Sequence, residues 1–124
     1  MAHGMRVPGP DHPITVEPTP ARVVVRVGDL VVADTTAALT LREADYTPVQ
    51  YVPLSDVDPA LLRRTKTSTY CPFKGKASYY TIAAPDGGEL TDAVWTYEEP
   101  YPAVAPIGGH VAFYPGRVEV RVQD

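Results

Sequence analysis

Short segments rich in β-branched residues recur along this chain, and several of them are followed directly by glycine, proline or aspartate. Arg22–Val27 and Leu30–Ala33 flank the pair Gly28-Asp29, which predicts two strands joined by a tight turn. The other expected strands are residues 36–42, 49–52, 78–83 and 89–90 together with 93–97, and a closing hairpin formed by 111–114 and 118–122.

A helix is indicated at one place only. Asp58 is suited to cap a helix and Pro59 to begin it, so the sequence predicts a helix of at most two turns that ends near Arg64. The expected fold is therefore mostly β, a small curled antiparallel sheet or partly open barrel with one short helix.

Proline is concentrated at the N-terminal end of the chain. Residues 1–20 hold five prolines and few large apolar side chains, which predicts a flexible arm, and residues 21–124 are expected to form a single β domain. No apolar run approaches the roughly 18 residues of a membrane span or resembles a secretory signal, and one cysteine cannot form an internal disulfide. We therefore expect a cytoplasmic protein.

Charge is unevenly distributed along the sequence. The formal net charge of −4 argues against binding to duplex nucleic acid, yet residues 59–85 contain no acid and five basic residues. These are Arg63, Arg64, Lys66, Lys74 and Lys76. Two explanations stay open: a solvated face whose bases pair with acids of neighbouring strands, or a groove that attracts an anion.

The same segment holds the only cysteine, Cys71, which Pro72 follows. Lys74 would approach Cys71 if the chain folds back at Gly75, and a nearby ammonium favours a reactive thiolate. His110 is the candidate general base that a nucleophilic thiol would need. Cys71, Lys74 and His110 are therefore the candidate catalytic residues, with a small buried hydrophobic side chain as the alternative interpretation of Cys71.

No metal or nucleotide cofactor is expected. His3, His12, His110 and Cys71 are isolated from one another, and no spacing typical of paired zinc ligands is present. The sequence also lacks the glycine-rich phosphate loops of nucleotide-binding folds.

Aromatic residues gather in the second half of the chain. On a strand, Tyr79 and Tyr80 point to opposite faces, so at least one is expected on a solvent or cavity side. Tyrosine hydroxyls and an indole N–H suit the lining of a pocket for a small polar ligand, while plain core packing is the alternative.

Several motifs together resemble the bacterial family known as domain of unknown function 427 (DUF427). The matching pieces are Thr69–Gly75 with Ala77 and Tyr79, Trp95–Tyr97, Pro100, Ile107, Gly109–Tyr114, Val32–Thr35, Tyr51–Pro53 and Asp56-Val57. The resemblance covers roughly residues 21–117 and implies a compact β fold of the Mss4-like topology, in which curled sheets form a cleft.

The resemblance does not extend to every property of that fold. Some Mss4-like proteins hold a structural zinc between paired cysteines, whereas Cys71 stands alone here. The family is also labelled nucleotidyltransferase-like, but two-metal phosphoryl transfer uses paired acids, and no pair of aspartates lies on one expected strand.

Three functions follow from these observations. The first is a binding module whose cleft, lined by Tyr70, Lys74, Tyr79, Trp95 and Tyr97, holds a nucleotide, sugar or sugar phosphate. The second is an enzyme that uses Cys71 as nucleophile or redox thiol, and the third is a protein interaction module. Exposed strand edges would also allow a homodimer.

Overall fold

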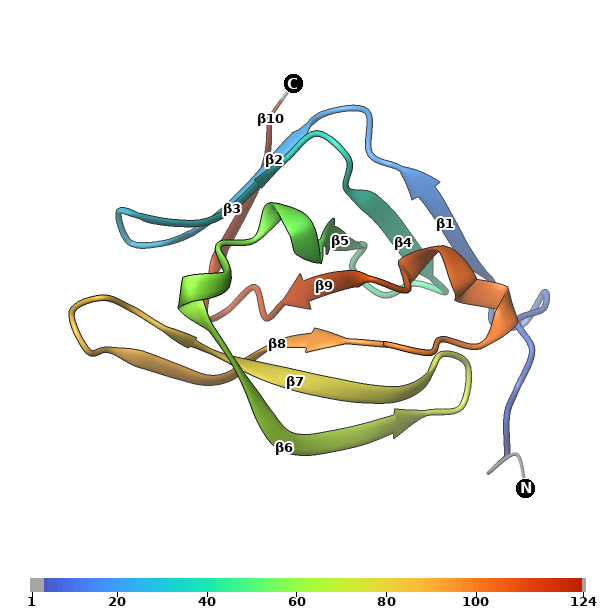
Figure 1. The fold of residues 1–124 in the computed structure, drawn as a ribbon. Coiled ribbons are helices and arrows are strands. Elements are labelled where there is room, and N and C mark those ends of the chain that lie inside the picture. The colour runs from blue at the N-terminus through green and yellow to red at the C-terminus, as the bar shows by residue number, and fades with distance from the viewer. Residues whose placement is uncertain (1–3, 124) are drawn as a thin grey trace.

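The computed structural model describes residues 4–123, which form two antiparallel sheets (Figure 1). The strands are β1 Ile14–Pro18, β2 Arg22–Val27, β3 Leu30–Thr35, β4 Leu39–Glu43, β5 Val49–Pro53, β6 Leu62–Cys71, β7 Gly75–Ala83, β8 Glu89–Thr96, β9 His110–Phe113 and β10 Glu119–Gln123. Seven strands build the larger sheet in the order β1-β4-β5-β9-β8-β7-β6, and β10-β2-β3 build the smaller one. Three short 3-10 helices connect them: η1 Leu54–Asp56, η2 Pro59–Leu61 and η3 Pro102–Ile107.

The predicted mostly β fold with a curled antiparallel sheet is confirmed, and the sheets close into no barrel within the described residues. The first predicted hairpin is β2 and β3, whose turn places Gly28 at a φ of 59°, a region that glycine adopts at little cost. The Mss4-like topology stays a prediction.

The N-terminal segment contributes a strand where the sequence predicted an arm. Ile14–Pro18 pairs with β4, and the half-buried Ile14 and Val16 alternate with exposed neighbours against the core. Further upstream the amide of Arg6 donates to the carbonyl of Pro72 over 2.8 Å. The sheet therefore begins before residue 21, because apolar alternation outweighs the local proline content; residues 1–3 of the predicted arm lie outside the described residues.

Strand β6 replaces the second half of the predicted helix. Asp58 does accept a hydrogen bond from the amide of Ala60, as expected of a cap, but the helix ends at Leu61 and Leu62 is already extended. The ten residues of β6 are rich in threonine, which favours strands, and seven of them pair with β7.

The predicted closing hairpin is wrong. β9 pairs with β5 and β8 in the larger sheet, whereas β10 crosses to the smaller sheet and pairs with β2. After the turn at Pro115, Val118 is buried in the core between the sheets, and this burial carries the chain from one sheet to the other.

Two apolar clusters hold the fold together. The first lies between the sheets and joins Val23 and Val25 of the smaller sheet to Val52, Val94 and Val111 of the larger one, all almost fully buried. The second packs η3 against the larger sheet through residues that include Leu41, Tyr51, Val104 and Ile107. No helix within residues 4–123 has the length and apolar character needed to cross a membrane.

Candidate functional site

A pocket of about 250 Å³ opens beside the second apolar cluster. Strands from both halves of the chain supply its walls, and most of its lining is aromatic. Its aromatic residues are Tyr46, Tyr51, Tyr79, Trp95, Tyr97 and Tyr114. The pocket therefore offers flat apolar surfaces and several hydroxyl groups to a small ligand.

A buried cluster of charged and polar groups lies at one side of the pocket. Lys74 Nζ donates to Glu43 Oε1 over 2.5 Å, and His12 Nε2 lies 2.7 Å from Glu43 Oε2. The residues Lys74 and Glu43 are only 8% and 9% exposed. Burial by itself raises the pKa of Glu43, but the hydrogen bonds from Lys74 and His12 outweigh it and hold that pKa below its ordinary value.

The segment before β1 covers this cluster. The His12 ring stacks on Phe73 at a centroid distance of 4.1 Å, and the Arg6 guanidinium lies 5.1 Å from the centre of the same ring. His12 also meets the edge of Tyr46. Residues upstream of the sheet thus shield the ion pair of Lys74 and Glu43 from solvent.

The hydroxyl groups of the pocket differ in their partners. Tyr51 accepts a hydrogen bond from Trp95 Nε1 over 3.2 Å, and the hydroxyls of Tyr79 and Thr69 lie 2.8 Å apart. Tyr97 is 8% exposed, and its hydroxyl makes no hydrogen bond to any residue between 4 and 123. Burial raises the pKa of both Tyr51 and Tyr97, so each hydroxyl keeps its proton at neutral pH.

Four of the five residues predicted to bind a ligand line this pocket together: Lys74, Tyr79, Trp95 and Tyr97. The fifth, Tyr70, does not, because its side chain joins a separate groove and its hydroxyl lies 2.8 Å from that of Tyr101. These placements describe where the side chains lie, and their role in binding stays a prediction.

The three candidate catalytic residues are only partly brought together. Cys71 is half-buried and its Sγ lies 3.9 Å from Lys74 Nζ, as expected if the chain turns back at Gly75. His110 instead places Nδ1 3.0 Å from the carbonyl oxygen of Gly108, and no hydrogen bond within the described part of the chain joins it to Cys71 or Lys74.

The basic segment is largely neutralised by neighbouring strands and loops. Lys74 pairs with Glu43, Arg63 with Glu89 and Arg64 with Glu98, which supports the explanation by pairing over an open anion site. Across residues 4–123, no three side chains of His, Cys, Asp or Glu come close enough to one another to hold a metal ion.

Sequence reasoning missed Glu43, Tyr51 and His12, which come from the first half of the chain. Tyr51 lies in a predicted strand, and its neighbour Trp95 is 44 residues away, so only strand pairing joins them. Glu43 gave one usable indication: it ends a strand on the same face as Leu41, which is a buried position.

Comparison with known proteins identifies the family of the chain. The sequence profile of the domain of unknown function DUF427 matches residues 15–124, which include every strand of both sheets except the first residue of β1. A search of curated proteins gives no match. Because the profile covers most of its length, the chain belongs to the DUF427 family.

Proposed function

We propose that the aromatic pocket binds one small polar molecule with a single sugar or nucleobase ring. The observation that carries this proposal is Tyr97, a residue of the pocket lining that is only 8% exposed and whose hydroxyl makes no hydrogen bond to residues 4–123. Because no buried side-chain nitrogen or oxygen of residues 4–123 lacks a hydrogen-bond partner, this hydroxyl still reaches solvent in the pocket, and a ligand can replace water as its partner. The pocket volume of about 250 Å³ suits a single ring better than a long chain.

The charges of the pocket favour a neutral ring over a phosphate. Lys74, the basic residue of the lining, is already bonded to the carboxylate of Glu43, so a phosphate would have to compete for its ammonium group. The sum of these two charges is zero, and electrostatic attraction of an anion is correspondingly weak. A neutral sugar or nucleoside is therefore the first ligand class to test, with sugar phosphates and nucleotides second.

Thermal unfolding against a panel of sugars, nucleosides, sugar phosphates and nucleotides tests the proposal. A ligand at 100 times its dissociation constant adds about 2.7 kcal/mol to the free energy of unfolding, which raises the melting temperature measurably. We expect one neutral class to respond and the response to fall in the Tyr97→Phe variant, which loses only the hydroxyl.

Tyr80→Phe is the matched control. Tyr80 lies on β7, next to the strand that Tyr97 follows, but it is outside the pocket lining. The Tyr80→Phe variant should therefore respond to the ligand as the wild type does. A panel without any response, or an equal response from both variants, would contradict the proposal.

A second candidate function is an enzyme that uses Cys71, favoured by the 3.9 Å distance between its Sγ and Lys74 Nζ. A cation beside the sulfur stabilises a thiolate, although the bond of Lys74 to Glu43 offsets this effect. The test is the rate of alkylation of the native protein at pH 7, in the wild type and in Lys74→Met. If Cys71 of the wild type is alkylated more slowly than a free thiol, this function is ruled out. The Cys71→Ser variant should leave ligand binding in the aromatic pocket unchanged.

A further inference from the structure

A second cavity, which we call the hairpin groove, lies on the other face of the β6–β7 hairpin. Alternate residues of β7 face opposite ways: Ala77 and Tyr79 join the apolar cluster beside the pocket, whereas Lys76 and Ser78 line the groove. The groove has a volume of about 760 Å³, about three times that of the pocket. It can therefore hold several linked rings where the pocket holds one.

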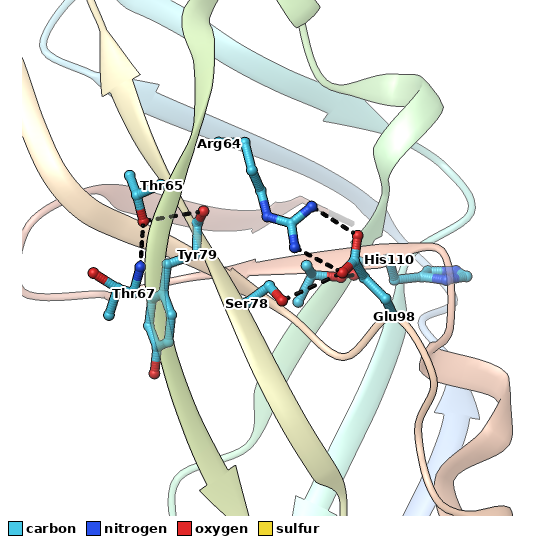
Figure 2. A network of polar contacts seen from close by, with 8 residues as sticks. Arg64, Thr65, Thr67, Ser78, Tyr79, Glu98 and His110 are labelled. Atoms are coloured by element: carbon cyan, nitrogen blue, oxygen red, sulfur yellow. Dashed lines mark hydrogen bonds and ion pairs between the residues drawn. The ribbon is translucent and has the colours of Figure 1, made fainter.

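Small side chains hollow the middle of the groove. Ser68 and Ser78 are direct partners across the hairpin, and both line the groove. At one end, Arg64 makes two hydrogen bonds of 2.9 and 3.1 Å to Glu98, whose carboxylate also accepts one from the Ser78 hydroxyl (Figure 2). This end presents a donor and an acceptor side by side.

Two tyrosines form the other end. Tyr70 and Tyr101 meet edge to face with centroids 6.3 Å apart, and their hydroxyls lie 2.8 Å from each other. Tyr70 is 41% exposed, so part of its ring surface is available to a ligand. Its pKa is raised to about 12, first by the hydrogen bond to Tyr101, so the ring stays neutral.

The wall opposite the hairpin is held in place by the backbone. The amide of Tyr101 donates to the carbonyl of Lys74 over 3.0 Å, and Gly75 at the hairpin tip has a φ of 108°. A Cβ at Gly75 would make an ordinary contact of 3.5 Å with the carbonyl oxygen of Glu99, so it is the φ of the turn that favours glycine here. The two ends of the groove thus keep a fixed separation.

Charge and hydrogen bonding narrow the class of ligand. Arg64 and Lys76 are balanced by Glu98 and Glu99, so the groove has no excess of positive charge for a chain of phosphates. The floor of the groove is the face of the β6–β7 hairpin, whereas a peptide adds to a sheet along an edge, which for β6 is the side away from β7. Addition of a peptide strand would therefore leave the floor of the groove unused.

We propose that the hairpin groove binds a neutral oligosaccharide. Every sugar hydroxyl both donates and accepts hydrogen bonds, which matches the pair of Arg64 and Glu98 and the serine floor. The apolar faces of the sugar rings would pack on the aromatic rings of Tyr70 and Tyr101, whose hydroxyl groups lie beside them for hydrogen bonding. The site is separate from the aromatic pocket and uses other residues.

Isothermal titration of the whole protein with neutral tetrasaccharides tests this site, with β-1,4-glucose, α-1,4-glucose and β-1,4-N-acetylglucosamine tetramers as the probes. We expect saturable binding of at least one, weakened about tenfold or more, which is 1.4 kcal/mol or more, in two variants. Ser68→Leu fills the middle of the groove from an exposed position, and Tyr70→Ala removes the ring.

Lys66→Leu is the matched control, because it places the same apolar side chain on the same strand outside the groove. Tyr97→Phe should also leave tetrasaccharide binding unchanged, which separates this site from the aromatic pocket. Absence of binding by every tetrasaccharide, or binding that survives in Ser68→Leu, overturns the proposal. The proposal is also overturned if no tetrasaccharide binds and the wild type instead binds a thymidylate hexamer or an extended hexapeptide whose binding Ser68→Leu abolishes.

Discussion

Replacing Lys74 by methionine removes one charge from a buried pair and leaves the other in place. The side chains of Lys74 and Glu43 are 10% and 11% exposed, so solvent screens them little. Breaking a buried ion pair from one side costs about 3–5 kcal/mol, because the remaining charge is uncompensated. His12 still bonds to Glu43 in the variant, and we therefore expect a loss near the low end, about 3 kcal/mol.

The double variant Lys74→Met, Glu43→Gln identifies the source of this loss. Glutamine keeps an acceptor for His12 but carries no charge. Replacing both members of a buried ion pair by neutral residues costs much less stability than removing one member and leaving the other charged. We expect the double variant to be more stable than Lys74→Met alone by about 2 kcal/mol. Urea unfolding at pH 7 measures both differences, since a domain stability of about 5–15 kcal/mol keeps the variants folded.

The effect should also depend on pH. The folded pKa of Glu43 lies below its ordinary value of 4.5, so the wild type has the full stability of the pair above that value and loses it as the pH falls through the folded pKa. In Lys74→Met the largest influence on Glu43 is burial, which raises its pKa, so the variant recovers stability when the carboxyl is protonated. The stability gap between the two proteins should therefore narrow from pH 7 to pH 4.

A gap that stays constant over this range would refute the electrostatic reasoning and attribute the loss to packing. The measurement is best repeated with His12→Gln in both proteins, because an imidazole can itself gain a charge between pH 8 and pH 5. A double variant that is less stable than Lys74→Met would refute it as well.

Three further changes test the packing around the pocket. Ile107→Ala should cost about 2–5 kcal/mol in urea unfolding, since the side chain is fully buried in the cluster of η3; a loss below 1 kcal/mol would mean that η3 is not docked. Tyr51→Phe should cost about 1–2 kcal/mol because Trp95 Nε1 loses its acceptor, and an unchanged tryptophan fluorescence maximum would argue against that bond. Gly75→Ala should cost more than about 1 kcal/mol, because an alanine is strained at a φ of 108°, and a neutral or stabilising effect would contradict the observed turn.

The sequence predicted the strands better than their pairing. Local β-branched composition marks β2, β3 and β5, and these strands lie within a residue or two of their predicted bounds. Local composition does not show that β10 leaves β9 and joins β2, because this pairing depends on where Val118 is buried. Strand β1 was missed because the prolines around it outnumber its two apolar residues, Ile14 and Val16, which pack on the core once β1 pairs with β4.

The candidate site follows the same rule. Trp95, Tyr79 and Tyr97 were predictable as a group because adjacent strands β7 and β8 pair Tyr79 with Trp95 and bring the three together. Tyr70 was assigned to them from nearness in sequence, yet β6 turns its side chain to the opposite face of the sheet. A residue's face depends on register, and β6 has an irregularity between Arg64 and Ser68 that no sequence pattern announced.

Glu43 shows why the chemistry of the pocket was the hardest part to predict. From the sequence, Lys74 belonged to a segment with no acid for many residues on either side, and an anionic ligand was a reasonable partner for it. Three strands separate β4 from β7 in the sheet, and the curl of the sheet brings Glu43, 31 residues away, to the ammonium group of Lys74 and makes a neutral pair there. The preference for a neutral ligand therefore comes from the fold of the sheet. Two variants should change this preference in opposite directions: Glu43→Gln should free Lys74 for a phosphate-bearing ligand, and Lys74→Met should weaken the binding of any such ligand.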